Sequence, residues 1–338
     1  MMTTDPPVFI SELRTQLEVI EKLIQKADAR GTADGNAEAK RYRLRRTEIQ
    51  KEIADYTWGQ DMKRTPTARV IPDLPLADYL ALPGIHASAI KRGSLSPLHL
   101  QAAMCSEPKE TPLMRFGRLA HQAVLEPERF ARAVTVWTGS SRRGSVWNAF
   151  CRKHRGREIV TQAERARLNR IAAAVRSHCQ AKHFLDGART EISVTWETKR
   201  YGPAKARFDA LAGDALVELK LTGDVSPFAF ERTAYRMGYH LQLGWYDEAQ
   251  RKAKLGVKDF ILVAVEAEEP FDVIVYRPLR MYVSEGRKLA VKLARAYWRA
   301  QGKGSFAGQS DDVEPLRLPG YAIVGPAALT IGGKELAV

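Results

Sequence analysis

The stretch that most constrains this fold runs from residue 204 to residue 222, where two alternating segments meet at the dipeptide Gly213-Asp214. Glycine at the first turn position adopts a positive φ without steric cost, so the pattern predicts a tight β-hairpin whose register follows by counting from the turn. Counting places Asp209 directly opposite Glu218. Their Cβ atoms would lie about 5 Å apart. At an effective dielectric of about 20 the two carboxylates would repel each other by roughly 3 kcal/mol.

Two interpretations of this hairpin face are open. A bound cation would relieve the repulsion between the acids. Alternatively, Arg207 and Lys220, which the same register places opposite each other on this face, neutralise the acids on a solvated surface. The spacing favours the cation, because an Asp on one strand followed by Glu-x-Lys on the next is the arrangement of the PD-(D/E)XK nucleases. The other face of the hairpin is apolar and is expected to lie on the core (Phe208, Ala210, Val217, Leu219 and Leu221).

The chain is strongly basic. Its 53 Lys and Arg residues outnumber 39 Asp and Glu residues, which gives a net charge of +14 and a pI near 9.7. Such an excess attracts phosphate-rich partners, so nucleic acid is the first expectation and an anionic membrane surface is the alternative. With 338 residues and 45% hydrophobic composition, the chain can bury a sizeable core, and a single α/β domain with an N-terminal extension fits its length.

Targeting and redox features point to a protein of the cytosol. The first residues contain no basic segment followed by an apolar core, and no apolar run approaches membrane-spanning length. We therefore expect a cytoplasmic protein without a membrane partner. The three cysteines, Cys105, Cys151 and Cys179, are far apart and form no Cys-x-x-Cys pair. This pattern supports neither a disulfide framework nor a zinc or iron–sulfur site.

Composition and periodicity divide the chain into four predicted parts. Apolar residues at steps of three and four predict an antiparallel, coiled-coil-like helical hairpin over residues 1–57. The hairpin could drive oligomerisation or fold back on the body. Three prolines and the absence of apolar periodicity indicate a linker over residues 58–75. The α/β domain follows over residues 76–301, and residues 302–338 form a loosely packed tail.

Within the α/β domain, capping signals and periodicity predict a series of helices and strands around the central hairpin. The predicted elements are short helices starting at Ser88 and Ser96, a helix through His121 ending at Glu126, a helix over 161–184, a strand over 191–197, a helical pair over 228–253 broken near Gly238, strands over 260–266 and 271–277, and a helix over 281–300. On these helices His121 is either a structural or a functional residue. Gln242 and Tyr246, one turn apart, could equally pack the tyrosine on the sheet.

Positive charge is concentrated in residues 139–170, which contain nine basic residues and only two acidic residues. Glycines and serines at the start of the segment suggest a mobile loop. The segment is either a solvated surface or an arm that holds DNA, and we favour the arm. Its candidate phosphate contacts are Arg142, Arg143, Arg152 and Lys153.

Seven short motifs occur in a fixed order between Leu76 and Ala300. They are Ser-Pro at residue 96, Phe-Gly-x-x-x-His at 116, Leu-Glu-Pro-x-x-Phe at 125, Glu-x-Ser-x-x-Trp at 191, Arg-x-Asp at 207, Glu-x-Lys at 218 and Gln-x-x-x-Tyr at 242. This order resembles the RecE family, the exonuclease VIII-like branch of the PD-(D/E)XK superfamily. The resemblance implies an α/β fold in which helices flank a central mixed β-sheet, as in the restriction-endonuclease-like core. It does not extend to the N-terminal hairpin.

The resemblance also implies a set of site residues. Asp209 and Glu218 would be catalytic and would bind Mg²⁺ together with the main-chain carbonyl of Leu219, while His121 and Glu191 would complete the metal site. Lys220 would orient and activate the attacking water. Gln242, Tyr246 and Arg207 would contact the DNA. Oxygen ligands suit Mg²⁺ or Mn²⁺, and a histidine among the ligands slightly favours a site that also accepts Mn²⁺.

The implied activity is 5′-to-3′ hydrolysis of one strand of linear duplex DNA in phage or prophage recombination. We correspondingly expect a homo-oligomer that acts on free DNA ends in a bacterial or phage-infected cell. A single-strand annealing protein is a candidate partner. Two alternatives are a structure-specific or nicking endonuclease with the same centre and a catalytically inactive DNA-binding module. The inactive module is disfavoured because every expected catalytic side chain is present.

Overall fold

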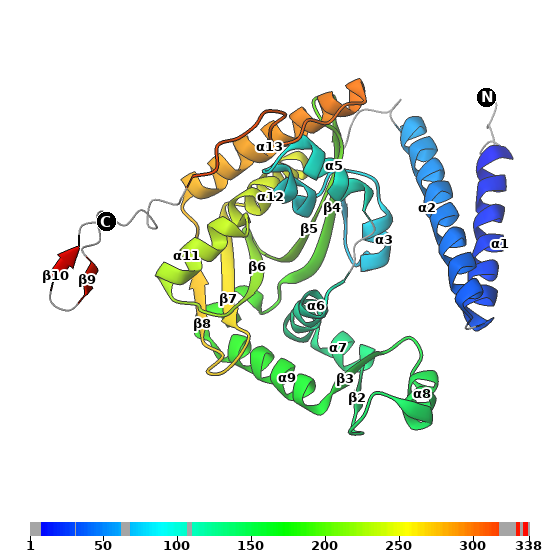
Figure 1. The fold of residues 1–338 in the computed structure, drawn as a ribbon, viewed down its shortest axis with the longest axis horizontal. Helices are drawn as coiled ribbons and strands as arrows, with labels where there is room; N and C mark the ends of the chain where they lie inside the picture. Colours follow the sequence, from blue (N-terminus) through cyan, green and yellow to red (C-terminus); the bar gives the residue numbers. More distant parts are fainter. Residues whose placement is uncertain are drawn as a thin grey trace.

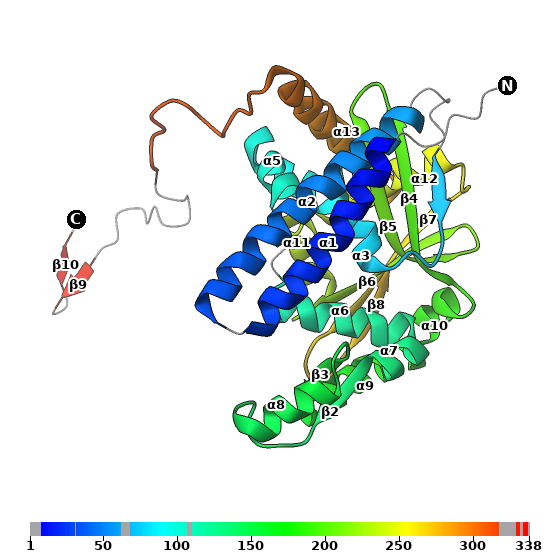
Figure 2. The same cartoon turned by 90° about the vertical axis from the view of Figure 1, so that its right-hand side faces the viewer.

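The computed structural model describes residues 8–30, 32–61, 68–106, 110–317, 329–331 and 334–336. At its centre lies a six-stranded sheet with helices on both faces, and a pair of long helices lies beside it (Figure 1, Figure 2). This arrangement confirms the predicted α/β fold class. No helix in the described part of the chain has the length and apolar character needed to cross a membrane.

The helices are α1 (Val8–Arg30), α2 (Ala33–Asp61), α3 (Leu76–Ala81), α4 (Ala87–Gly93), α5 (Pro97–Cys105), α6 (Pro112–Leu125), α7 (Pro127–Ala133), α8 (Gly144–Lys153), α9 (Gln162–Ser177), α10 (Cys179–Leu185), α11 (Pro227–Arg236), α12 (Tyr239–Ala253) and α13 (Arg280–Lys303). The strands are β1 (Arg69–Ile71), β2 (Val134–Trp137), β3 (Glu158–Thr161), β4 (Arg189–Thr198), β5 (Gly202–Ala212), β6 (Ala215–Thr222), β7 (Asp259–Glu266), β8 (Val273–Tyr276), β9 (Leu329–Ile331) and β10 (Lys334–Leu336).

Local sequence signals account for several helix ends. The side chains of Ser96, Thr111 and Thr161 accept main-chain N–H groups at the starts of α5, α6 and α9, as N-cap residues do. The single helix predicted over residues 161–184 is wrong, because it is broken at His178. That residue has an extended backbone, and its side chain accepts the N–H of Ala181 to begin α10.

The central sheet has the strand order β1-β4-β5-β6-β7-β8. Strands β6 and β7 run parallel, and the other neighbouring pairs run antiparallel. The parallel pair needs a long connection, which α11 and α12 provide. One core lies between the sheet and α12, with Trp196, Tyr201 and Trp245 at its centre. The other lies between the sheet and α6 and α9, around Leu119 and Leu168.

The central hairpin has the register that counting from its turn predicts. Ala210 pairs with Val217, and Ala212 pairs with Ala215. At the turn Gly213 has a φ of +56°, a conformation that glycine adopts at no steric cost. Because both faces of the sheet are covered by helices, the apolar side chains of this hairpin belong to one or the other of the two cores.

The prediction that the hairpin has a single apolar face is wrong. Phe208 belongs to the core beside α12, whereas the other four residues of the predicted face lie in the core beside α6 and α9 (Ala210, Val217, Leu219 and Leu221). The alternation of β5 therefore shifts by one residue at Asp209. On β4 the facing residue, Glu191, has a φ of +54° and falls between the pairs Thr190–Ala210 and Ile192–Phe208. The two strands bend together at this level.

Helices α12 and α13 cross in direct backbone contact. A Cβ atom added to Gly244 would overlap the main-chain nitrogen of Arg287, and one added to Gly286 would overlap the carbonyl oxygen of His240. Any side chain at either position would force the helices apart. Near the crossing, Arg287 of α13 forms an ion pair with Asp247 of α12 at 3.0 Å. The two helices are therefore fixed to each other.

The predicted N-terminal hairpin takes the form of α1 packed against α2. Ile20 and Ile24 of α1 meet Ile49 of α2, so the apolar seam is used within the pair. Residues 1–7 and, in the predicted linker, residues 62–67 lie outside the described residues. The next segment, β1, already pairs antiparallel with β4, so the central sheet begins before residue 76.

Two further features complete the fold. In the predicted tail, β9 and β10 form an antiparallel pair, while residues 318–328, 332–333 and 337–338 lie outside the described residues. Residues 134–161, which we call the α8 arm, form a parallel pair of β2 and β3 joined through α8 and project at the bottom of Figure 1. Trp137 packs edge-to-face against Trp147 and Phe150 of α8. The sequence pattern did not predict this strand pair.

Candidate active site

The two facing acids lie where β5 and β6 separate. Backbone pairing between these strands ends at Ala210 and Val217. Beyond that pair, the Asp209 N–H donates to Glu218 Oε1 at 3.3 Å, and the Leu219 N–H donates to Asp209 Oδ2 at 2.9 Å. The carboxylate oxygens thus accept hydrogen bonds from main-chain N–H groups. In a continuous β-sheet, these N–H groups would bond to main-chain carbonyls of the neighbouring strand. The arrangement brings two negative charges together inside the sheet.

Burial and proximity set the charge state of the acids. The side chain of Glu218 is 1% exposed and that of Asp209 is 16% exposed. Burial and the neighbouring Asp209 carboxylate both raise the pKa of Glu218. Burial also acts to raise the pKa of Asp209, but His121 and Lys220 outweigh it and hold that pKa below its usual range. Opposite shifts in adjacent acids indicate that the two compete for charge in one site.

A lysine and an amide converge on Glu218. Lys220 Nζ donates to Glu218 Oε2 at 2.7 Å, and Gln242 Nε2 donates to the same oxygen at 2.8 Å. Burial acts to lower the pKa of Lys220, but Glu218 and Asp209 outweigh it and raise that pKa. The ammonium group also lies 5.0 Å from the ring centroid of Tyr239, a favourable cation–π distance. Lys220 is therefore charged near neutral pH and acts as a donor.

His121 reaches the acids from α6. Its Nδ1 lies 3.3 Å from Asp209 Oδ2, and its side chain is 26% exposed. Burial acts to lower the pKa of His121, but the Asp209 carboxylate outweighs it and raises that pKa. The sequence left a structural and a functional role open for His121. The geometry places the residue beside the candidate acids, which favours the functional role.

Glu191 and Arg207 form a partly buried pair at the edge of the site. Arg207 Nε donates to Glu191 Oε2, and its Nη1 donates to the Leu74 carbonyl at 2.7 Å and to Ser193 Oγ at 3.0 Å. Its side chain is only 10% exposed. The Nε and Nη1 donors of Arg207 are therefore used inside the protein, and a contact of this residue with DNA stays a prediction. Burial and Asp209 raise the pKa of Glu191.

Gln242 and Tyr246 lie on the face of α12 that covers the site. Gln242 Nε2 lies 3.0 Å from the Tyr246 hydroxyl, so the amide joins Tyr246 to Glu218. The tyrosine ring packs edge-to-face on Phe208 with the centroids 5.0 Å apart and is 6% exposed. Tyr246 thus packs on the sheet, as the structural alternative expected, while its hydroxyl contacts the polar cluster.

Sequence reasoning missed Lys91 of α4. Its Nζ donates to Gln242 Oε1 at 3.4 Å, and its aliphatic chain crosses Gly238, where an added Cβ would lie 3.1 Å from Lys91 Cγ. Burial and the nearby Lys220 lower the pKa of Lys91 to about 8. The site therefore has two ammonium groups close to Glu218. No local sequence signal could have linked Lys91 to residues 151 positions away.

The donor chemistry of this cluster suits a hard divalent cation, because carboxylate and carbonyl oxygens are its preferred ligands. The acids now accept internal hydrogen bonds, and within the described ranges no three His, Cys, Asp or Glu side chains converge into a complete metal-binding group. Asp209 and Glu218 therefore fit as two ligands whose repulsion a cation would relieve. Main-chain oxygen or water would have to supply the remaining ligands.

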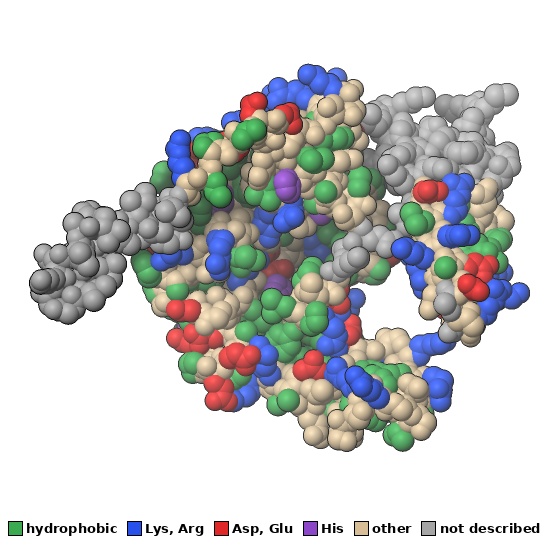
Figure 3. Space-filling view, viewed as in Figure 1, with side chains coloured by type: hydrophobic (Ala, Val, Ile, Leu, Met, Phe, Trp, Pro, Cys, Tyr) green, Lys and Arg blue, Asp and Glu red, His purple; other side chains and the backbone are tan. Residues whose placement is uncertain are grey.

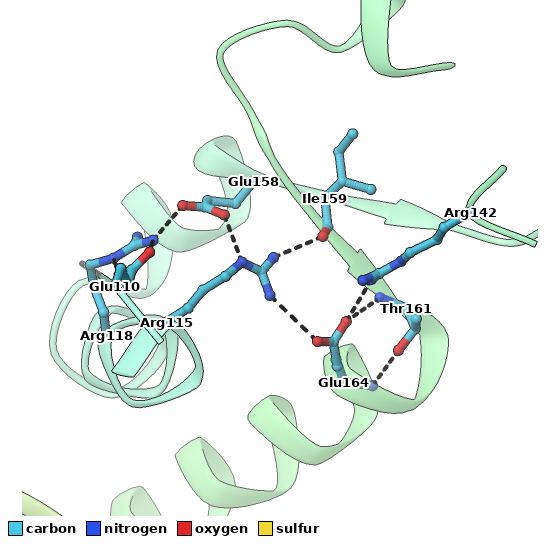
Figure 4. Close-up of polar contacts among 8 residues, drawn as sticks. All are labelled: Glu110, Arg115, Arg118, Arg142, Glu158, Ile159, Thr161 and Glu164. Carbon is cyan, nitrogen blue, oxygen red and sulfur yellow. Dashed lines mark hydrogen bonds and ion pairs between the residues drawn. The ribbon is translucent and has the colours of Figure 1, made fainter. Parts of the chain in front are cut away.

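A second polar network fixes the helix that carries His121 (Figure 4). Arg115 of α6 donates to Glu158 at 3.2 Å and to Glu164 at 3.4 Å, which ties α6 to β3 and to the start of α9. Glu164 also accepts the Thr161 N–H at 2.7 Å in a capping box. Arg142 donates to the same carboxylate at 3.0 Å.

The four candidate arm residues are thus not equivalent. Arg142 is held between Glu164 and the ring of Trp147, whose centroid lies 5.8 Å away. Arg143 precedes α8, and Arg152 and Lys153 occupy its last turn; all three side chains are exposed. The arm therefore presents these three cations to solvent, while Arg142 holds the loop against α9.

Comparisons with known proteins cover most of this domain. A family model described as "PDDEXK-like domain of unknown function (DUF3799)" matches residues 87–319. No curated protein sequence matches the chain. A solved structure from Eubacterium rectale, assigned as an exonuclease, shares 12% identity over 70% of this chain and 91% of that chain, with a TM-score of 0.48. A phage-related exonuclease from Haemophilus somnus 129PT shares 10% identity over 66% of this chain and 97% of that chain, with a TM-score of 0.27.

Both TM-scores lie below 0.5, so the assignment rests on the family model. The matched residues span most of the chain and include the central hairpin, the helix with His121 and the helix with Gln242. This agrees with the RecE-like PD-(D/E)XK motif order found in the sequence. The chain belongs to the family of PDDEXK-like domains.

Proposed function

We propose that this protein is a divalent-metal-dependent deoxyribonuclease with its catalytic centre at Asp209, Glu218 and Lys220. The observation that carries this proposal is the pair of facing carboxylates, held where β5 and β6 separate, with a charged lysine 2.7 Å from one of them. Such a pair is costly without a cation. Its chemistry supports phosphodiester hydrolysis, in which negative charge develops on phosphoryl oxygens.

Asp209 and Glu218 would hold Mg²⁺ or Mn²⁺, with the Leu219 carbonyl, His121 and Glu191 as further candidates around them. A bound ion of this kind lowers the pKa of a water molecule and polarises a phosphoryl oxygen. The hydrogen bonds from the Leu219 and Asp209 N–H groups orient the two carboxylates before an ion arrives.

The other side chains act on the substrate. Lys220, charged near neutral pH, would orient the attacking water and neutralise the scissile phosphate. Gln242 shares its amide between Glu218 and the Tyr246 hydroxyl and would position the phosphate as α12 passes over it. Lys91 adds a second ammonium group at the same place.

The substrate in this proposal is linear duplex DNA, cut 5′-to-3′ from a free end, as the RecE-like resemblance implies. Arg143, Arg152 and Lys153 of the α8 arm would contact its phosphates. In the same proposal the protein is a homo-oligomer and acts in phage-type recombination with a single-strand annealing protein as partner. The fold itself is also compatible with cutting inside a duplex.

The test incubates linear and covalently closed circular duplex DNA with the protein and Mg²⁺, and with EDTA in a parallel reaction. Asp209→Asn, Glu218→Gln and Lys220→Met should each reduce cleavage on the order of 10²-fold or more, the loss typical of removing one group that stabilises the transition state. Glu128→Gln, at an exposed position of α7, is the control.

The results distinguish an exonuclease, an endonuclease and an inactive DNA-binding module. Cleavage of linear DNA alone supports the exonuclease, and nicking of closed circles supports the endonuclease. DNA binding without any cleavage leaves an inactive binding module. Folded Asp209→Asn and Glu218→Gln proteins that cut at the wild-type rate would refute this assignment of the catalytic centre.

A further inference from the structure

A cationic cavity lies on α13, apart from the candidate active site. It has a volume of about 560 Å³ and is lined by Arg200, Lys288, Val291, Lys292, Arg295 and Arg299. Five of these six side chains are basic, and none is acidic. In Figure 3, Lys and Arg side chains gather at the upper edge of the molecule, where Figure 1 places α13. None of these residues belongs to the site around Asp209.

Four of the cations form a row along one helix face. Lys288, Lys292, Arg295 and Arg299 follow one another at steps of four, three and four residues, the spacing of neighbours on a helix surface. At about 1.5 Å per residue the row is about 16 Å long. It is therefore an extended strip of charge.

The fifth cation comes from the turn between β4 and β5. This turn is fixed against α13, because a Cβ atom added to Gly202 would overlap the ring of Trp298. Gly202 itself has a φ of +70°, so both its conformation and its contact require glycine. Arg200 is brought to the cavity by this packing.

Within the described residues one cation of the row has an acidic partner, because Lys288 pairs with Glu285 at 2.6 Å. On another side of α13, Arg287 pairs with Asp247, but Lys292, Arg295 and Arg299 take part in no ion pair in the described part of the chain. The Nε of Arg295 is buried and has no hydrogen-bond partner there. Like charges three or four residues apart destabilise a helix. A polyanion would relieve this repulsion.

We propose that this cavity binds the phosphates of a DNA strand beyond the catalytic centre, as a second DNA-binding site of the nuclease proposed above, on which this inference rests. A row of 16 Å matches about five phosphates of one strand at ~3.4 Å of axial rise each. A membrane surface fits less well, because Val291 is the one apolar lining residue, and interfacial binding needs an apolar face.

The fold sets the separation between this cavity and the acids. Gly202 and Asp209 are seven residues apart on β5, which is about 23 Å at ~3.3 Å per residue. A duplex starting at the acids and following β5 would reach the Gly202 end of the cavity only after about 7 base pairs. The contribution of the cavity should therefore depend on DNA length.

The test measures DNA binding to the full-length protein by fluorescence anisotropy, with EDTA present to prevent cleavage. Lys292→Gln/Arg299→Gln removes two exposed cations of the cavity. Arg280→Gln/Lys303→Gln removes the same charge from exposed positions of the same helix outside it. The ligands are a duplex of about 30 base pairs and a hairpin with a stem of about 8, each over a series of salt concentrations.

The cavity variant should lose about fivefold or more in affinity for the long duplex and clearly less for the short stem. Its slope of log affinity against log salt should fall by roughly 1.8, since each phosphate contact contributes about 0.9. The control variant should bind as the wild type does. Unchanged binding, equal loss in both variants or equal loss for both lengths would overturn the proposal.

Two further arms identify the source of the phosphates and separate the two proposals. If tripolyphosphate binds the wild type but not the cavity variant, and the variant keeps its affinity for DNA, the cavity serves a free polyphosphate and the DNA assignment is overturned. If binding to the long duplex depends on the cavity but the wild type cuts no DNA with Mg²⁺, the cavity proposal stands and the nuclease proposal fails.

Discussion

The main-chain N–H of Asp209 donates to the Glu218 carboxylate at 3.3 Å, and Asp209 in turn accepts the N–H of the residue after Glu218. Each acid is thus oriented by the strand that carries the other. The backbone of one hairpin therefore supplies a hydrogen-bond donor to each of the two carboxylates.

A divalent cation should stabilise the folded protein even without DNA. At a concentration about ten times its Kd, an ion bound only by the folded state raises the free energy of unfolding by about 1.4 kcal/mol. Thermal melting with Mg²⁺ or Mn²⁺ should show this increase in the wild type and in Glu128→Gln but not in Asp209→Asn. An equal increase in Asp209→Asn would place the ion elsewhere.

Lys91 should contribute to catalysis although it lies outside the central hairpin. Lys91→Met keeps the aliphatic packing against Gly238 but removes the ammonium group near Gln242. We expect kcat/KM to fall by about tenfold or more, which corresponds to about 1.4 kcal/mol of lost transition-state stabilisation. Lys91→Arg should recover part of the loss, and the exposed Arg92→Met serves as control. An unchanged single-turnover cleavage rate in Lys91→Met would show that Lys91 has only a structural role.

Lys205 should be important for stability. It is 3% exposed, and its Nζ donates to the carbonyls of Tyr79, Leu80 and Leu82 at 2.6 to 3.0 Å. Lys205→Met would leave these carbonyls at the end of α3 without their donor and should cost about 3 kcal/mol. Urea denaturation compared with the exposed Lys199→Met would measure it. A difference below about 0.5 kcal/mol would show that water replaces the ammonium group.

His86 should make the protein sensitive to mild acid. Burial and the nearby Lys205 lower its pKa from 6.5 to about 4, so the unfolded chain takes up the proton first as the pH falls. The contribution of His86 to the free energy of unfolding is fully present above pH 6.5 and is lost as the pH falls from 6.5 to about 4. The total loss is at most about 3 kcal/mol.

The matched variant is His86→Asn. Asparagine can still accept the Ala89 N–H at the start of α4, but it does not titrate. The free energy of unfolding of this variant, measured by denaturant at several pH values, should depend less on pH than that of the wild type. Parallel curves for the two proteins would rule out His86 as the source.

The parts of the site that sequence predicted are those fixed by local geometry. A two-residue turn at Gly213 determines the pairing on both sides of it, so counting was enough to place Asp209 opposite Glu218. The order of short motifs was enough for the family. In both cases the relevant residues are specified by spacing along the chain rather than by tertiary packing.

Other parts depend on packing that spacing does not encode. The shift of alternation at Asp209 was missed because a period of two assumes an unbent strand. Lys91 meets Gln242 only after α4 docks on α12. The row ending at Arg299 has the same helical spacing as any solvated face. Only the structure shows that Lys292, Arg295 and Arg299 take part in no ion pair within the described residues, while Arg287 pairs with Asp247.

The crossing of α12 and α13 at Gly244 and Gly286 has a consequence for observing the protein at work. Helices whose backbones touch cannot slide independently, so a displacement of Gln242, two residues before Gly244, must carry α13 with it. A fluorophore attached at Leu289, which is 38% exposed on α13, would therefore report the arrival of substrate from a position outside the site. A label on this outer helix would thus give a spectroscopic view of the proposed catalytic centre, whose Glu218 side chain is buried.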